Sequence, residues 1–273
     1  MKSVSRILSL RDDLTSLHTL DLYNRCTHDF DFVDPNILKS IVNYAVSHNV
    51  QQVQICVTCD IQQLPFCLFS SQTLTSLDLS IHHRILRGNV LFPSSLNLPA
   101  LTTLSLKGFY FRSGDNGCAE PFSALRKLSN LIIRHFRVLD AQTLCISNTT
   151  LVNFTMETYY DYKDICKLEL STPSLTNFAF TGTPNPILSV SHPCSITHLY
   201  VNAEDIVIFV KENSAVLLSW LLEFANIKSL TVSSNTLQVL RPLYLYTAVL
   251  QLLAFSLFIS ICLHFSLFIS IFF

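Results

Sequence analysis

Apolar residues recur along this chain in a short unit, in which one apolar residue is followed three and five positions later by two more. Nine such units occur, at Leu17/Leu20/Leu22, Val50/Val53/Ile55, Leu74/Leu77/Leu79, Leu101/Leu104/Leu106, Leu128/Leu131/Ile133, Leu151/Phe154/Met156, Leu175/Phe178/Phe180, Ile196/Leu199/Val201 and Ile227/Leu230/Val232. Their first positions step by 33, 24, 27, 27, 23, 24, 21 and 31 residues. One such unit means little in a Leu-rich chain, but nine at this spacing predict a repeat architecture.

The last two apolar residues of each unit lie two positions apart, as they would on one face of a β-strand. We therefore expect strands at 19–22, 52–55, 76–79, 103–106, 130–133, 153–156, 177–180, 198–201 and 229–232. No single repeat can bury its own apolar face, so neighbouring repeats must stack. Most steps fall within the range of about 20 to 29 residues typical of leucine-rich repeats, with two longer insertions. The predicted fold is an α/β leucine-rich-repeat solenoid, curved, with a parallel sheet on its concave side and helices or irregular loops outside.

The residue between the two buried strand positions should face outward, which makes the concave sheet a candidate contact surface. In chain order these outward residues are Asp21, Gln54, Asp78, Ser105, Ile132, Thr155, Ala179, Tyr200 and Thr231. We take the polar and aromatic members as candidate protein-binding residues, namely Asp21, Gln54, Asp78, Ser105, Thr155, Tyr200 and Thr231. Tyr159, Tyr160 and Tyr162 join them, because tyrosine-rich loops often make adaptable contacts. The alternative for this tyrosine segment is a solvated loop between two repeats.

Helical spacing interrupts the repeats at their two longest steps. Residues 35–48 and 215–225 place apolar side chains at intervals of three and four, so we expect a helix at each. Only the last repeat has an asparagine, Asn235, at the position where regular extracellular repeats use an amide to bond the turn after the strand. This absence favours the irregular intracellular kind, and residues 1–241 are predicted to form one domain of about nine irregular repeats.

Residues 242–273 differ from the rest because they contain no Asp, Glu, Lys or Arg. We expect this apolar tail to be helical and separate from the repeat sheet. Under one interpretation it is a transmembrane helix, since it exceeds the ~20 residues needed to cross a bilayer and has Lys228 and Arg241 on its N-terminal side. Under the other it is translated non-coding sequence, because FSLFISI at 255–261 recurs at 265–271.

Charge content excludes one class of function, and cysteine content indicates the compartment. The chain has 18 Lys and Arg against 19 Asp and Glu, which excludes a nucleic-acid binder that depends on bulk positive charge. Its nine cysteines are scattered and no signal peptide precedes them, as is typical of a reducing compartment. We expect a cytoplasmic or nuclear location, or a membrane if the tail is a genuine anchor.

Motifs for catalysis or metal binding are weak. Cys56 and Cys59 form a Cys-x-x-Cys pair without the second pair that zinc requires, and the adjacent His82 and His83 point to opposite sides of an extended segment. No phosphate-binding loop, nucleophile elbow or paired-carboxylate pattern occurs. We therefore expect no catalytic residue, no cofactor and no metal ligand, and a protein that is not an enzyme.

Several segments resemble the plant F-box/leucine-rich-repeat proteins of the FBD type. They are LRDDLTSLHTLDL (10–22), AVSHNVQQVQI (45–55), LPFCLFSSQTLTSLDLS (64–80), LFPSSLNLPALTTLSLKGF (91–109) and LLSWLLEFANIKSLTVSSNTLQVL (217–240). In that family an F-box binds the Skp adaptor of a cullin ubiquitin ligase, and the repeats hold the substrate. The F-box hallmark has no counterpart here, so the resemblance implies Skp binding only if an F-box is supplied upstream.

The leading hypothesis is thus a protein-interaction solenoid that resembles the substrate-recognition part of an F-box ubiquitin-ligase receptor and binds an unidentified protein substrate. The alternative hypothesis is a membrane-anchored leucine-rich-repeat interaction protein, held in place by residues 242–273.

Overall fold

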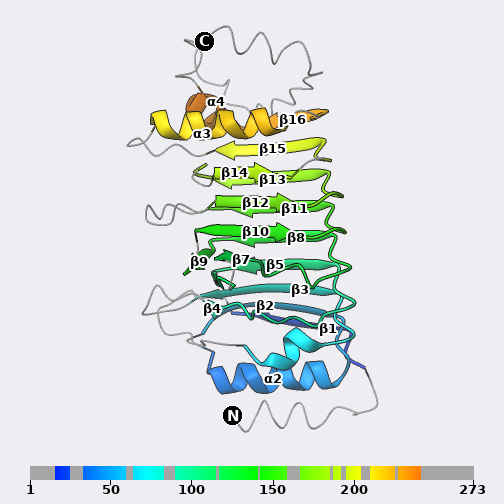
Figure 1. Cartoon of the computed structure of the whole chain (residues 1–273). Helices are drawn as coiled ribbons and strands as arrows, with labels where there is room; N and C mark the ends of the chain where they lie inside the picture. The colour runs from blue at the N-terminus through cyan, green and yellow to red at the C-terminus, as the bar shows by residue number, and fades with distance from the viewer. Residues whose placement is uncertain are drawn as a thin grey trace, which may run out of the picture.

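The computed structural model describes residues 16–24, 33–59, 64–82, 90–114, 117–140, 142–158, 167–184, 187–191, 195–203, 210–224 and 227–240. Within these ranges the chain forms a parallel β-solenoid, whose successive coils stack from the N-terminal to the C-terminal end (Figure 1). The predicted tail, residues 242–273, lies outside the described residues, as do Tyr159, Tyr160 and Tyr162.

Nine strands form one continuous parallel sheet in the order β1-β2-β3-β5-β8-β11-β13-β15-β16. Their bounds are β1 Thr19–Tyr23, β2 Gln52–Thr58, β3 Ser76–His82, β5 Thr103–Lys107, β8 Asn130–Arg134, β11 Asn153–Glu157, β13 Asn177–Gly182, β15 His198–Ala203 and β16 Ser229–Val232. Each begins at the residue that the apolar spacing predicts. The nine predicted strands and their parallel pairing are confirmed.

The strands pair so that equivalent positions of the repeat lie side by side. Leu104 of β5, for example, is opposite Leu77 of β3 on one side and Leu131 of β8 on the other. All three side chains are fully buried. Removing such a side chain from water contributes roughly 1.5–3 kcal/mol, and the register gives each one apolar neighbours in both adjacent coils. This stacking explains why the spacing within a repeat, and not its total length, determines the fold.

The opposite side of the solenoid also consists largely of strands, which corrects the expectation of helices or irregular loops there. A second parallel sheet has the order β14-β12-β10-β7 and a third the order β4-β6-β9. Their strands are β4 Val90–Leu91, β6 Phe109–Arg112, β7 Cys118–Ala119, β9 Arg137–Leu139, β10 Thr143–Ser147, β12 Lys167–Ser171 and β14 Ile187–Val190. In β10 and β12 alternate residues are buried, so the coils that contain them are closed by two apolar faces that meet in the core.

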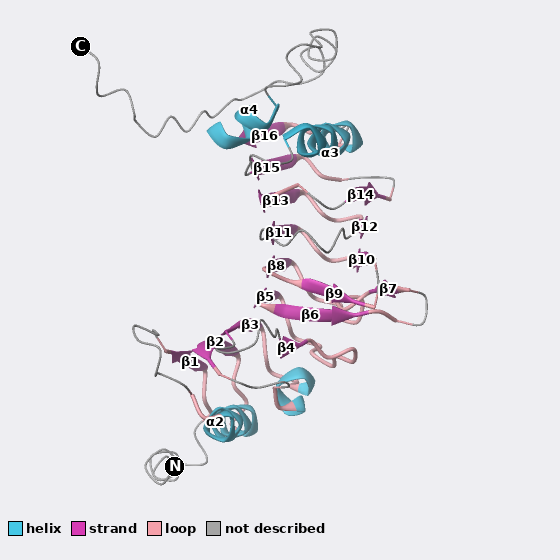
Figure 2. Cartoon of the chain, turned by 90° about the vertical axis from the view of Figure 1, so that its left-hand side faces the viewer, coloured by secondary structure: helices cyan, strands magenta, loops and turns pink. Residues whose placement is uncertain are grey.

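Figure 2 shows the nine-stranded sheet along one side of the stack and β10, β12 and β14 along the other. The stack bends near β3 toward the side of the nine-stranded sheet, as a concave sheet requires. The short 3-10 helix η1, Phe66–Ser70, lies beside α2, Pro35–Ser47, at the N-terminal end.

Both predicted helices are present, and a third was missed. Helix α2 begins where Asp34 accepts a hydrogen bond from the Asn36 amide at 2.8 Å, and it ends at Ser47. Helix α3, Val210–Glu223, starts earlier than predicted, and its Trp220 ring meets Phe180 edge to face. Helix α4, Ser234–Leu240, was not predicted, and Asn235 lies exposed on it instead of bonding a turn.

Candidate functional site

The outward face of the nine-stranded sheet presents three parallel rows of side chains, because every second residue of each strand points away from the core. The middle row is the predicted contact row, and we call it the central row. Its residues pair in register across the whole sheet, and they are Asp21, Gln54, Asp78, Ser105, Ile132, Thr155, Ala179, Tyr200 and Thr231. The sequence spacing therefore placed these residues side by side correctly.

Members of the central row differ in how much they are exposed. Asp21, Gln54 and Tyr200 are exposed, whereas Asp78 is half-buried. Ser105 is only 5% exposed, and its Oγ accepts a hydrogen bond from the Arg134 guanidinium at 3.3 Å. The expectation that Ser105 is exposed is therefore wrong, because a long side chain from the next strand covers it.

A second outward row, two residues further along each strand, concentrates charge on this face. It contains Ser80, Lys107, Arg134 and Glu157, which pair in register on β3, β5, β8 and β11. We call it the charged row. Arg134 Nε lies 3.4 Å from Glu157 Oε2, whereas Lys107 stands directly beside Arg134. Adjacent like charges in a sheet are unfavourable, so this pair of cations has a cost in stability.

His135 follows the charged row and completes its hydrogen-bonded network. Its Nε2 lies 3.3 Å from Glu157 Oε1, so Glu157 contacts both Arg134 and His135. Burial lowers the pKa of His135, Glu157 opposes this shift, and the cationic neighbours, chiefly Lys107, reinforce it. The backbone of His135 is left-handed, with φ 49°.

The two rows border one shallow depression of about 300 Å³. Its lining includes the central-row residues Gln54 and Asp78, the charged-row residues Lys107, Arg134 and Glu157, and Tyr23 at its N-terminal edge. Tyr23 is 60% exposed, and exposed tyrosines are frequent at protein interfaces. The depression thus combines carboxylates, cations and an aromatic ring on a rigid sheet.

Lys107, Arg134, Glu157 and Tyr23 were missed at the sequence level. A signal existed, because a residue two positions after an outward strand residue also points outward. The prediction stopped at one residue per repeat and so omitted the row that contains most of the charge.

A separate cluster lies on the outward face of the four-stranded sheet, where Cys118 of β7, Cys145 of β10 and Glu169 of β12 come together. The Cys145 Sγ donates a hydrogen bond to Glu169 Oε2 at 3.6 Å. Desolvation, followed by the neighbouring Cys118, raises the pKa of the Cys145 thiol to about 12. The cluster was missed because it depends on the register of a sheet that was not predicted.

The Cys-x-x-Cys pair lies at the C-terminal end of β2. Cys56 is half-buried on the outward face and Cys59 is buried. Neither belongs to the metal-ligand cluster found among the described residues.

No helix in the described part of the chain is long and apolar enough to cross a membrane.

Comparison of the chain with known family models, with curated proteins and with solved structures found no match.

Proposed function

We propose that this protein is an interaction solenoid that binds a partner protein through the outward face of its nine-stranded sheet. The observation that supports this most directly is the depression, whose lining includes Asp78, Lys107 and Tyr23. A parallel solenoid is well suited to this role, since stacked coils present an extended and continuous surface.

The charged row indicates what the partner contributes. Lys107 and Arg134 lie next to each other in register, and only Arg134 has a carboxylate, Glu157, within ion-pair distance among the described residues. An acidic group of the partner, placed over Lys107, would relieve this repulsion and form charge-assisted hydrogen bonds. Asp78 on β3 and Gln54 on β2 would accept hydrogen bonds from donor groups of the partner. The partner surface is therefore expected to carry an acidic side chain flanked by hydrogen-bond donors.

We further propose that the repeats are leucine-rich repeats of the F-box/leucine-rich-repeat type and act as a substrate-recognition arm of a ubiquitin ligase. The support is the resemblance of the repeat segments together with the common register of all nine units. Under this proposal Skp binds only when an F-box is supplied upstream, and the bound protein is the substrate. Under this proposal the role is binding, for which the face presents polar and charged side chains along a whole row.

The experiment compares proteins retained by the immobilised chain with those retained by two charge variants. Lys107→Glu reverses a charge inside the depression, and Lys127→Glu reverses one at an exposed site outside its lining. A true partner is lost with Lys107→Glu and kept with Lys127→Glu. Its purified form should then bind the Lys107→Glu variant at least about tenfold more weakly, which is roughly 1.4 kcal/mol.

The depression is excluded as the contact site if both variants retain every captured protein equally, or if a purified captured protein binds both variants equally. The ligase proposal has its own test, in which purified Skp adaptor is titrated into the chain. We expect no binding unless an F-box is fused upstream, and direct binding to the unfused chain would contradict the requirement for an upstream F-box.

A further inference from the structure

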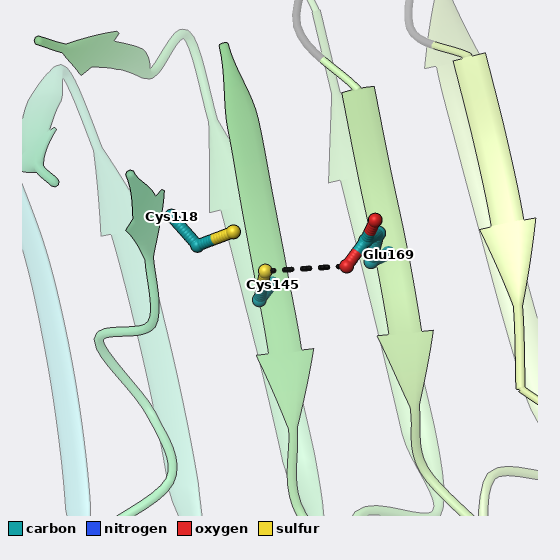
Figure 3. A group of neighbouring side chains, drawn as sticks. All are labelled: Cys118, Cys145 and Glu169. Atoms are coloured by element: carbon teal, nitrogen blue, oxygen red, sulfur yellow. Dashed lines mark hydrogen bonds between the residues drawn. The ribbon is translucent and has the colours of Figure 1, made fainter. Parts of the chain in front are cut away.

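Three potential metal ligands converge on the side of the solenoid opposite the proposed binding face. Cys118, Cys145 and Glu169 come from the neighbouring strands β7, β10 and β12, and Figure 3 shows their side chains close together on one face. In β10 the flanking Leu144 and Ile146 are buried in the core, so Cys145 points outward. The same alternation turns Glu169 outward on β12. The positions of these residues on the strands therefore determine the face from which the ligating side chains project.

The distances suit a small, thiophilic cation. One ligand atom from each side chain lies within 4.8 Å of the other two, and Cys145 Sγ is 3.6 Å from Glu169 Oε2. A tetrahedral Zn²⁺ site, with Zn–S near ~2.3 Å and Zn–O near ~2.1 Å, separates its ligand atoms by about 3.5–3.8 Å. The observed separations, 3.6 Å for one pair and within 4.8 Å for all, are close to these values. Two sulfur ligands also favour Zn²⁺ over Mg²⁺ or Ca²⁺, which prefer oxygen.

Lys167 orients the carboxylate without occupying the ligand position. Its Nζ lies 2.6 Å from Glu169 Oε1, while the other oxygen, Oε2, is directed at Cys145. This division matches metal sites in which an outer residue holds one oxygen of a ligating carboxylate and thereby fixes the other. The positive charge of Lys167, together with that of the cation, also offsets the charges of two thiolates and a carboxylate.

The surroundings leave room for a fourth ligand. The cluster borders an open depression of about 430 Å³ whose lining also includes Glu120 and Ser147. Glu120 lies just beyond the end of β7, two residues after Cys118, and lines the same depression. A fourth ligand can thus come from solvent or from Glu120, whereas the far side of the site is closed by the sheet.

We propose that Cys118, Cys145 and Glu169 form a Zn²⁺ site, with the fourth coordination position open to this depression. The ion would link the three adjacent coils that contain β7, β10 and β12. Binding displaces the thiol protons, and the free energy of binding adds to the stability of the folded state. The site is independent of the proposed protein-binding face.

The test is a Zn²⁺ titration of the reduced full chain in competition with a chelating dye. We expect one equivalent to bind, the melting temperature to rise, and Co²⁺ substitution to produce a thiolate-to-cobalt charge-transfer band. Cys145→Ser and Cys118→Ser should each abolish that band and the stabilisation by Zn²⁺. Lys167→Met, which leaves all three ligands in place, should weaken binding by about 10- to 100-fold.

Cys56→Ser is the matched control, because Cys56 is also half-buried but lies on the nine-stranded sheet. It should bind Zn²⁺ like the unmodified chain. The circular dichroism of every variant shows whether the fold is retained, and Glu169→Gln provides a ligand change that preserves shape. The proposal is overturned if the reduced chain binds no Zn²⁺, or if Cys56→Ser lowers the stoichiometry as much as Cys145→Ser does. Formation of a Cys118–Cys145 disulfide by a chain that does not bind Zn²⁺ would equally overturn it.

Discussion

The side-chain amide of Asn153 donates a hydrogen bond to Oδ1 of Asn130 on the adjacent strand, at a distance of 2.6 Å. Asn153 in turn accepts an equivalent bond of 2.6 Å from Asn177 on the next strand. The three asparagines occupy the first position of β8, β11 and β13, so they form a short ladder along the outward face. This ladder joins three coils through side chains in addition to the backbone bonds of the sheet.

The ladder predicts that Asn153→Ala is destabilising although the residue is only half-buried. The substitution removes two side-chain hydrogen bonds, so we expect the free energy of unfolding to fall by about 1–2 kcal/mol. Urea denaturation of the purified variants measures it. Thr155→Ala, on the same strand, is the control and should change stability by less than about 0.5 kcal/mol. Equal effects at the two positions would show that the ladder contributes nothing.

A second prediction concerns the apolar row in the central coils. Leu104 is fully buried between Leu77 and Leu131, so Leu104→Ala should leave a cavity and cost about 2–5 kcal/mol. Urea melts of this variant should show a clearly lower midpoint. Gln54→Ala, at an exposed position, is a suitable control, whereas Ser105 is not, because it is buried and hydrogen-bonded to Arg134. A similar midpoint for the two variants would contradict the inward and outward assignment.

The main sheet could be predicted from sequence because its signal is local. Two apolar residues at i and i+2, preceded by a third at i−3, are enough to locate each strand, whatever the length of the coil between them. The second sheet gives an uneven signal: β10 and β12 alternate in the same way, and Ile165/Leu168/Leu170 repeats the apolar spacing, but other strands of this sheet lack it. Strands such as Cys118–Ala119 have two residues and show no alternation, so their pairing follows only once the coils are stacked.

The two candidate sites differ in how far they could be predicted from the sequence, and the reason is the same. Gln54 and Asp78 were found from the spacing of the main sheet, and Lys107 and Arg134 follow from the same period of two. The cysteine cluster is non-local in sequence, since Cys118, Cys145 and Glu169 are separated by 27 (145 − 118) and 24 (169 − 145) residues. These separations equal typical repeat steps, which is the one sequence signal that could have linked them.

A third prediction uses the close approach of two backbone segments at the end of β13. Gly182 has φ 117°, and a Cβ added there would collide with the carbonyl oxygen of Thr158. We expect Gly182→Ala to lower the free energy of unfolding by at least about 2 kcal/mol, because strain and overlap add. Thermal and urea melts would measure the loss.

Gly117 is the matched control for this substitution. It also has positive φ, 74°, but nothing lies within 4 Å of the added Cβ. Gly117→Ala should therefore show only the conformational cost, about 1 kcal/mol. If the two alanine variants are equally stable, the approach of Thr158 to Gly182 does not restrict this position.

The last prediction concerns pH and His135. Burial is the largest cause that lowers the pKa of His135 in the folded chain, with Lys107, His82 and Arg134 acting in the same direction and Glu157 against it. Between the lowered folded pKa and the unfolded value near ~6.5, the unfolded chain binds more protons, so stability rises with pH in that window. Stability should consequently be full above about pH 6.5 and decrease as the pH falls through the folded pKa. The free energy of unfolding from urea melts at several pH values above about 5 tests this.

His135→Asn should reduce this loss of stability on acidification, since asparagine cannot be protonated there and tolerates the left-handed backbone at φ 49°. Some dependence of stability on pH should persist in this variant, because desolvation and Lys107 also lower the pKa of His82. His18→Asn, at an exposed position on the N-terminal side of β1, is the control and should retain the full dependence. An unchanged slope in His135→Asn, or an equal reduction in His18→Asn, would show that the buried imidazole beside Glu157 is not responsible for the sensitivity to acid.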